Sequence, residues 1–543
     1  MFGKLHHIFD ALTDAESEIV QRAAFIFLVA LVLNAVNVFY KGTTITPAPG
    51  GSYTEGVVGQ PIAVNPLLID KNNPDRDLVT LTFASLTDLA EEIKTSPDGQ
   101  TWTVRLRKNL RWSDGEPLTA DDVLFTLQTI QNPDAHAALF ATWHGVTGER
   151  VSEREIRFIL KVPYVFFSTN LDEFRPVPVH IFGAIPPQNL RLSDFNLEPV
   201  GSGPYMANGF EKRRDGFIST FRLVSNPYFA GDEPLIDEFR FRFFISYGDA
   251  INAFNRREID GLSDLSAEDA AHIKISKNLH EVRLPRYYAI FTNPATAAPL
   301  KEKEVRRALN LAINRATLIS QVLDGHGIPV NGPLLPGIEG GSPIETATSS
   351  SQRDEAILLL EKAGWVRGED GVRTKKINNN HLRLAFELVV PDLDFLVATA
   401  KEIKKEWAVI GVSLTPVIMP TSEIANEVMR ARNYQLLLFG NVMKLNPDVF
   451  SFWHSSERFY PGLNLSLYEN KNADRLLESL RRDFDANSRK ATLKRFTRLI
   501  AEDTPAIFLF SSNYLYAAPK NLGGFNAELM ASPADRFRGV TRW

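Results

Sequence analysis

Cysteine is absent from this chain of 543 residues. Its absence excludes disulfide bonds, thiolate metal sites and cysteine nucleophiles, and also a lipid-modified cysteine as the means of attachment to a membrane. A strong charge of one sign is absent as well, because the net charge is only −5. We therefore expect no general attraction to nucleic acid and no nucleic-acid partner.

The sequence also lacks the common catalytic motifs. It has no HExxH, no GxSxG, and no histidines clustered at ligand spacing. The glycines of Gly201-Ser202-Gly203-Pro204 lack the Lys-Ser/Thr of a phosphate-binding loop, which favours a structural role in a tight strand entry. The adjacent acids Asp121-Asp122 and Glu91-Glu92 fit capping or solvated positions. We therefore predict no metal, no cofactor and no enzyme activity; a hydrolase with an unrecognised site is the alternative.

What is present is the composition of an ordinary globular protein, with 44% apolar and 23% charged residues. A chain of this length is too long to fold around a single hydrophobic core, so we expect two to four domains.

One long apolar run stands near the start of the chain. Ala23–Tyr40 contains no charged residue and would reach roughly 27 Å as a helix, just enough to span a bilayer. We predict an uncleaved signal anchor at 23–41, a cytoplasmic leader at 1–22 and a linker at 42–52, with all later residues outside the cytoplasm. A cleaved secretory signal is the main alternative, although the leader is long and of mixed charge. A buried core helix is the third.

The most informative stretch is Ser96–Pro133. Trp102, Val104 and Leu106 alternate with polar residues, which predicts a half-buried strand. Asp114-Gly115 indicates a turn, and Thr119 with Asp122 three residues later is typical of a capping box that begins a helix.

The exact residues of this stretch indicate a protein family as well as a local structure. The run LRKNLRWSDGEPLTADDVLFTL closely resembles the signature of the solute-binding proteins of family 5, the extracellular receptors of peptide- and nickel-type ABC importers. The resemblance continues in order to about Tyr516. Its further segments are VGSGPYMANGF (Val200–Phe210), FNRREIDGL, VRRALNLAINRATLI and NPDVFSFW (Asn446–Trp453).

Periodicity and these segments together predict the other elements. We expect strands at Tyr53–Val58, Arg154–Leu160, Tyr287–Asn293, Gly411–Pro416 and Tyr434–Gly440, and helices at Asp77–Leu86, Phe166–Leu171, Lys303–Gly325, Asp354–Ala363, Phe395–Ile410 and Asn487–Glu502. The helix at Lys303–Gly325 is the clearest, because Val305, Leu309, Ala312, Ile313, Ala316 and Ile319 form an apolar stripe.

The resemblance implies an α/β fold of periplasmic-binding-protein type II, with two lobes and an extra inserted subdomain, preceded here by one transmembrane helix. Mapped onto this chain, lobe I is 50–66, 196–291 and 511–543, the inserted subdomain is 67–195, and lobe II is 292–510. Hinges are expected near Phe291–Pro294 and Phe508–Ser511, and ligand binding is expected to shift an equilibrium between open and closed lobes.

The resemblance also indicates a ligand cleft between the lobes. Many peptide receptors of the family carry an aspartate shortly before the Pro-Asp pair, to bind a peptide's amino group, whereas this chain has Met443 and Lys444 there. A lysine repels an ammonium group, so Lys444 favours an anionic ligand or a solvent-facing position. Asp448 fits a cap of the following helix. The cleft candidates are Asn65, Trp143, Tyr287, Tyr288, Gly440, Asn441, Val442, Met443, Lys444, Trp453, Phe510 and Ser511.

By resemblance, the chain is expected to be a monomeric, extracytoplasmic receptor that delivers a peptide or other small solute to an ABC permease. The alternative is a membrane-anchored sensory or scaffold protein that keeps the fold without transport, which the long leader motivates.

Overall fold

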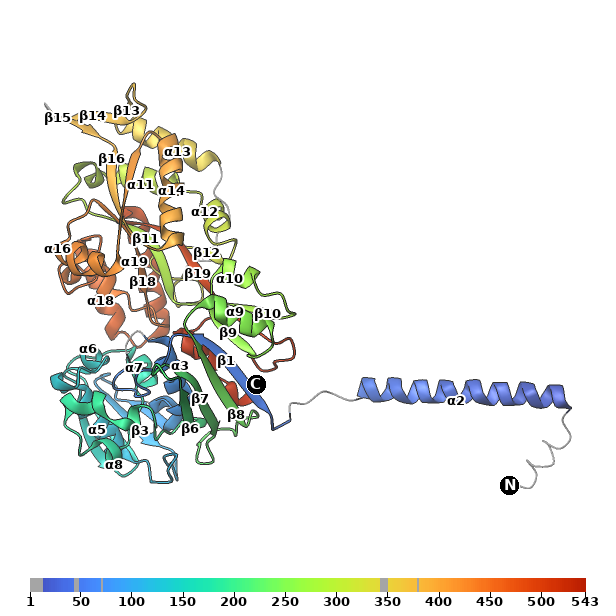
Figure 1. Cartoon of the computed structure of the whole chain (residues 1–543). Coiled ribbons are helices and arrows are strands. Elements are labelled where there is room, and N and C mark those ends of the chain that lie inside the picture. Colours follow the sequence, from blue (N-terminus) through green and yellow to red (C-terminus); the bar gives the residue numbers. More distant parts are fainter. Residues whose placement is uncertain (1–12, 43–47, 70–71, 342–349, 378–379) are drawn as a thin grey trace. The chain divides into compact units, whose positions relative to one another are not determined.

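The computed structural model describes residues 13–42, 48–69, 72–341, 350–377 and 380–543 (Figure 1). Two units are distinguished, residues 1–49 and 50–543, and each is described by itself. In the first unit, α2 (Asp14–Gly42) is a continuous helix without a buried residue. It is long and apolar enough to cross a membrane, with a mean hydropathy of 2.2 over its most apolar 18 residues. The leader residues 1–12 and the linker residues 43–47 lie outside the described part.

The second unit is built on one long sheet whose strands run in the order β17-β16-β18-β11-β19-β9-β1-β8-β7-β6. We call lobe I the part of the unit built on β1 and β6–β10, and lobe II the part built on β11, β12 and β16–β18. Their bounds are β1 (Ser52–Val58), β6 (Tyr205–Lys212), β7 (Ile218–Ser225), β8 (Glu238–Phe244), β9 (Gly261–Leu265), β10 (Asn278–Arg283), β11 (Arg286–Thr292), β12 (Gly327–Pro329), β16 (Ala385–Pro391), β17 (Ser413–Met419) and β18 (Leu436–Val442).

The strand β19 (Ala506–Ala518) joins the two lobes. Its first half pairs with β11, from Ala506 opposite Phe291 to Phe510 opposite Tyr288. Its second half pairs with β10 and β9 of lobe I. Since β10 and β11 follow one another in the chain, two antiparallel connections pass between the lobes. The structure is thus a two-lobed α/β fold.

Two smaller sheets accompany the long one. A four-stranded sheet in the order β2-β3-β5-β4 contains the predicted strand of the Ser96–Pro133 stretch, and a three-stranded sheet β13-β14-β15 lies in lobe II. Their bounds are β2 (Ala90–Thr95), β3 (Thr101–Leu106), β4 (Thr147–Ser152), β5 (Glu155–Ile159), β13 (Val366–Arg367), β14 (Arg373–Ile377) and β15 (Asn380–Arg383).

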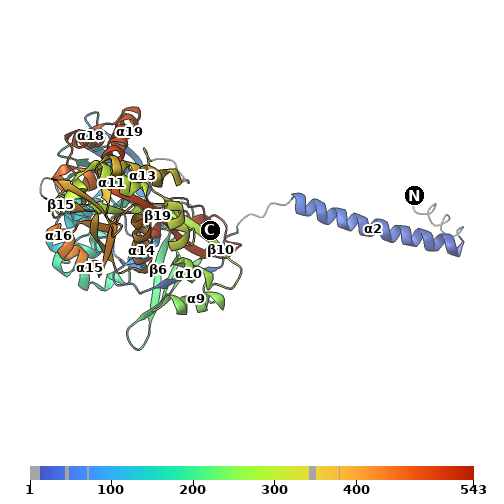
Figure 2. The ribbon, with the colours of Figure 1, turned by 90° about the horizontal axis from the view of Figure 1, so that it is seen from above.

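Helices cover the sheets. Their bounds are α3 (Asn73–Thr82), α4 (Leu86–Leu89), α5 (Ala120–Ile130), α6 (Phe140–Trp143), α7 (Phe167–Glu173), α8 (Val179–Phe182), α9 (Tyr247–Asn255), α10 (Ala267–Ala271), α11 (Lys303–Leu311), α12 (Arg315–Val322), α13 (Ser350–Lys362), α14 (Asp394–Val409), α15 (Thr421–Glu423), α16 (Met429–Ala431), α17 (Phe450–Trp453), α18 (Lys471–Arg482) and α19 (Ala486–Asp503). In lobe II, α14 packs on β16 and β17. The helices α18 and α19 pack against each other (Figure 2).

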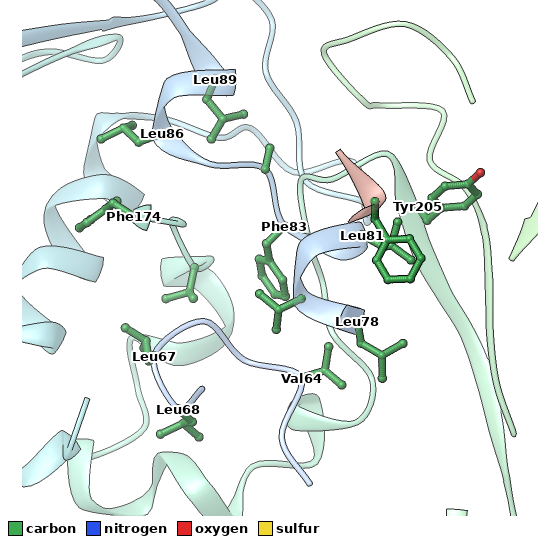
Figure 3. Close-up of a cluster of buried hydrophobic side chains, with 14 of the residues drawn as sticks. Val64, Leu67, Leu68, Leu78, Leu81, Phe83, Leu86, Leu89, Phe174 and Tyr205 are labelled. Atoms are coloured by element: carbon green, nitrogen blue, oxygen red, sulfur yellow. The ribbon is translucent and has the colours of Figure 1, made fainter. Parts of the chain in front are cut away.

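The four-stranded sheet shares one hydrophobic core with lobe I. Trp102 of β3 and Tyr53 of β1 belong to the same buried cluster. Figure 3 shows the middle of this cluster, where leucines of α3 and α4 lie with Phe174, at the end of α7, and Tyr205 of β6. In lobe II, neighbouring residues of β11 such as Ile290 and Phe291 join different clusters, because successive side chains point to opposite faces of a strand. Both faces of the lobe II sheet are therefore buried.

The local predictions for Ser96–Pro133 are confirmed. Residues 101–106 form β3, and Gly115 has φ +92° in a turn that its N–H closes on the Trp112 carbonyl at 2.9 Å. Thr119 and Asp122 form the expected capping box at the start of α5. The structural role of the glycines before β6 is confirmed too. A Cβ on Gly203 would come within 2.5 Å of the Leu81 carbonyl oxygen, so only glycine permits this close approach to α3.

Two helix predictions are wrong in extent. Lys303–Gly325 is not one helix but two, α11 and α12, because the Asn314 side chain accepts a hydrogen bond from the Thr317 N–H at 3.1 Å and begins a new helix. Ala316 of the predicted stripe is exposed, and Arg315 is buried in its place. The helix expected at Asp77–Leu86 ends at Thr82, and α4 follows separately. The remaining predicted strands and helices are present, with ends shifted by a few residues.

Candidate functional site

A cavity of about 740 Å³ opens between the four-stranded-sheet region and lobe II. One wall comes from residues 141–146 and 160–170. The other comes from residues 442–452, at the end of β18 and beyond, with Leu463 and the last turns of α18. The volume lies within the range of small-molecule sites. Among the described residues, no group of histidines and carboxylates could hold a metal ion.

A cluster of three side chains joins the two walls at one side of the cavity. The Tyr164 hydroxyl donates to Asp448 Oδ2 at 2.8 Å, and Arg481 Nε donates to both Asp448 oxygens at 2.9 and 3.0 Å. The Arg481 guanidinium also lies 3.8 Å from the centre of the Phe450 ring. Burial first, and then the charge of Asp448, raise the pKa of Tyr164, so its hydroxyl keeps the proton that it donates.

Lys444 makes a second bridge between the walls. Its Nζ lies 2.7 Å from Glu173 Oε2 and 3.0 Å from Asn170 Oδ1, both on α7. A third contact runs from Asn446 Nδ2 to Thr169 Oγ1 at 3.1 Å. The walls are thus held together by polar contacts that join residues more than 270 positions apart.

Asp448 has more partners than the sequence indicated. Its Oδ1 accepts a bond from the Phe450 N–H at 3.3 Å, as a cap of α17 would. The hydrogen bonds of Asp448 to Tyr164 and Arg481 are shorter than its bond to the Phe450 N–H, and both partners come from distant segments of the chain. The main role of Asp448 is therefore to join the two walls. Neither partner was among the predicted site residues, because no local pattern links positions 164, 448 and 481.

Of the twelve predicted cleft residues, three line this cavity: Val442, Met443 and Lys444. Of these, Val442 is exposed, Met443 is buried, and Lys444 is paired rather than free.

Six others lie on the strands that pass between the lobes or next to them. Asn441 Nδ2 donates to the Tyr287 hydroxyl at 2.9 Å, and Gly440 lies opposite Tyr288 in the β11–β18 register. Phe510 packs on Tyr288 with 5.6 Å between ring centres, and Ser511 is buried. Burial raises the pKa of Tyr287. These side chains lie on both faces of the lobe II sheet, since Tyr287 belongs to one buried cluster and Tyr288 and Phe510 belong to the other.

The other three predicted residues are elsewhere in the core. Trp143 is fully buried against Phe158, Phe167 and Phe174, at 4.7 to 5.4 Å between ring centres, so its ring does not face the cavity. Asn65 is buried and donates to Asn196 Oδ1 at 3.0 Å, which orders the chain before α3. Trp453 is buried with Phe508, at 5.8 Å between ring centres. The two tryptophans are buried because large apolar rings gain most from leaving water, and Asn65 is buried with its side-chain hydrogen bond made.

Comparison with known proteins gives one consistent picture. Residues 86–459 match the family of bacterial extracellular solute-binding proteins, family 5 Middle. The chain is 27% identical over 509 residues to the oligopeptide-binding protein AppA of Bacillus subtilis (strain 168), covering 88% of this chain and 89% of that protein. The solved structure of Bacillus subtilis AppA with a nonapeptide superposes with a TM-score of 0.67 at 24% identity, over 92% of this chain and 99% of that one. The ABC transporter substrate-binding protein CtaP of Listeria monocytogenes gives a TM-score of 0.75 at 24% identity, over 91% and 99%.

Proposed function

Because this chain belongs to the bacterial extracellular solute-binding proteins of family 5, we propose that it captures a peptide or similar small solute outside the cytoplasm and delivers it to an ABC importer. The observation that carries the proposal is the cavity between the two walls, which has the size of a small-molecule site and is bridged by polar contacts. Such a site binds by enclosure and needs no covalent chemistry. The relatives named for oligopeptide binding favour a peptide.

The proposed binding step is closure of the lobes. The chain changes sheet partners at two places. One lies between Arg283 and Arg286, and the other lies where β19 leaves β11 after Phe510 and meets β10 at Asn513, with Ser511 and Ser512 still paired with β12. Bending there would move lobe II against lobe I with little change to the strand pairing inside each lobe. This supports the predicted hinge at Phe508–Ser511 and moves the other from Phe291–Pro294 to the break between β10 and β11. Val442, Met443 and Lys444 are the proposed ligand contacts.

The lobe and subdomain boundaries given from the sequence are part of the same proposal, except that the boundary at residue 291 moves to the break between β10 and β11. A monomer is proposed, because each lobe has its own buried clusters. The sensory or scaffold alternative rests on the leader, and no contact of the described residues favours it.

For α2 we propose an uncleaved anchor, with the leader in the cytoplasm and residues after about Lys41 outside. Its apolar segment is long enough to span a bilayer, and Lys41 follows it directly. Intact-mass measurement of the protein from membranes tests this: a mass that includes residues 1–41 supports the anchor, and a chain that begins after them shows cleavage.

Mass spectrometry of solutes that co-purify with the 50–543 fragment tests the receptor function, together with small-angle scattering before and after the identified solute is added back. We expect a smaller radius of gyration with solute. If no solute co-purifies and a library of short peptides changes neither the radius nor the melting temperature, the proposal is contradicted.

A further inference from the structure

The apolar helix α2 carries two asparagines in its second half, Asn34 and Asn37. Both side chains are exposed, and neither makes a hydrogen bond to another described residue of the chain. Asn34 lies about 9 Å along the helix from Tyr40, where the uncharged run ends. In the proposed bilayer-spanning position its amide is therefore in hydrocarbon, where no water replaces a missing hydrogen-bond partner and an unpaired polar group is costly.

The two asparagines lie on one face of α2. A helix turns by about 100° per residue, so positions three apart are separated by only about 60° around the axis. Glu16 lies on the same face about five full turns before Asn34, and Lys41 lies there about two turns after it. We call these four residues the asparagine face. The opposite face of the membrane segment carries apolar side chains, among them Phe25, Val32 and Val36.

The asparagine face is charged at both ends, with opposite signs. Glu16 and Lys41 are about 38 Å apart along the helix, which places both at the polar surfaces of a bilayer. The Thr13 hydroxyl donates to the Glu16 carboxylate at 2.7 Å and lowers its pKa, so this carboxylate stays ionised. The face thus presents an anion at the leader end, amides within the membrane and a cation at the linker end.

A second copy of α2 is a poor partner for this face. Asparagine amides can bond to each other, because each of them both donates and accepts. Two copies inserted in the same direction, however, would bring Glu16 against Glu16 and Lys41 against Lys41, and like charges in contact repel. The whole face is satisfied instead by a different helix, with a basic residue at the leader end, a polar residue within the membrane and an acidic residue at the linker end.

We propose that the asparagine face of α2 docks on a transmembrane helix of the ABC importer's permease, which carries this complementary pattern. The inference rests on the proposed anchor and on the proposed delivery to an importer, and it names the surface that meets this partner. Asn34 and Asn37 bond to a polar side chain within the membrane. Glu16 and Lys41 select a helix with the matching charges at its two ends. Docking of α2 keeps the receptor beside the importer and raises its effective concentration there.

Photo-crosslinking in membranes of the native host tests the proposal on the full chain. The photoreactive amino acid benzoylphenylalanine replaces Ala30, which stands about one turn before Asn34 on the asparagine face. The matched control carries it at Val32, on the opposite face. The membranes are irradiated, and the adducts of the two chains are identified and quantified by mass spectrometry. We expect an adduct with a transmembrane segment of an ABC permease from position 30, and much less of it from position 32.

The double variant Asn34→Leu/Asn37→Leu, with the photoreactive residue at position 30, removes the amides and still inserts, because leucine is more apolar than asparagine. We expect about tenfold less permease adduct, as the loss of two interhelical hydrogen bonds predicts. The control is Val32→Leu/Val36→Leu, which changes the opposite face and should keep the yield of adduct.

The outcomes separate this inference from the receptor function, which is measured on the 50–543 fragment without α2. Three results overturn the docking face while solute capture stands: equal permease adducts from positions 30 and 32, an adduct with a second copy of this chain alone, or a double variant that keeps the permease adduct. A mature protein that lacks residues 1–41 also overturns it, together with the anchor. If the fragment captures no solute while the adduct still depends on the two asparagines, the docking face stands and the receptor function is overturned.

Discussion

Lys444 Nζ lies 2.7 Å from Glu173 Oε2, so the loop after β18 in lobe II is joined to α7 beside the four-stranded sheet. Both side chains remain 36% exposed. An ion pair of this exposure is screened by water and contributes little to the free energy of unfolding. What it contributes is position, because it brings together two segments that line one cavity.

Replacing both partners of this pair should reveal a small coupling. In a double-mutant cycle of Lys444→Met and Glu173→Gln, we expect a coupling of about 0.5 kcal/mol in urea unfolding of the 50–543 fragment. The coupling should fall at high salt. A coupling that salt leaves unchanged would show that the pair does not act through its charges.

Arg536 should matter far more for stability. It is fully buried, with Nη2 3.0 Å from Glu55 Oε1 and Nη1 2.8 Å from Asp77 Oδ1. Arg536→Met leaves two buried carboxylates without a cation, so we expect a loss of about 3–5 kcal/mol in urea unfolding. The control is Arg538→Met, because the Arg538 side chain is half exposed and should cost about 1 kcal/mol or less. Similar losses for the two variants would contradict this account.

The same cluster predicts a dependence of stability on pH. Burial outweighs the attraction of Arg536 and raises the pKa of Glu55 to about 7. The folded chain then binds this proton more tightly than the unfolded chain does. The free energy of unfolding should therefore fall as the pH rises from the ordinary glutamate pKa towards 7, by at most about 1.4 kcal/mol per pH unit.

Glu55→Gln isolates this contribution, because glutamine has the same shape and does not titrate. The difference in unfolding free energy between the unchanged protein and Glu55→Gln should decrease from pH 5 to pH 8. A difference that stays constant, or that increases with pH, would show that Glu55 is ionised throughout the range.

The helix cap in the family signature can be tested by itself. In Thr119→Ala, α5 loses the side-chain oxygen that accepts the Asp121 N–H at 3.2 Å. We expect a loss of about 1 kcal/mol. The control is Thr147→Ala on β4, an exposed threonine without a side-chain hydrogen bond among the described residues. Circular dichroism during urea unfolding measures the free energy of unfolding of both variants. An equal loss in the two would show that the cap does not stabilise the protein.

Sequence reasoning succeeded where the physical cause is local. Thr119 and Asp122 are three residues apart, so their capping box can be read directly from the chain. The prediction of a single helix at Lys303–Gly325 was wrong because a second local signal was overlooked. Its apolar stripe was read without the competing cap of Asn314, and Arg315 is buried because it reaches Phe508 O at 2.8 Å, almost two hundred residues away.

The candidate site was predicted only in part. The segment Val442–Lys444 was identified from the resemblance, and it lines the cavity. Tyr164, Glu173 and Arg481 were missed, because their roles depend on partners in distant segments. Trp143 was placed near the cleft for its aromatic ring, and in the structure that ring fills the core.

The sequence by itself determined the family, the two-lobed α/β class and the existence of an apolar helix near the start, because these depend on composition, periodicity and the order of short motifs. Only the tertiary structure decided which charges remain free. Whether Lys444 or Arg481 is available to a ligand depends on what lies within about 4 Å of each, the range over which ion pairs form. That distance is set by the packing of the lobes, and neighbours along the chain do not reveal it.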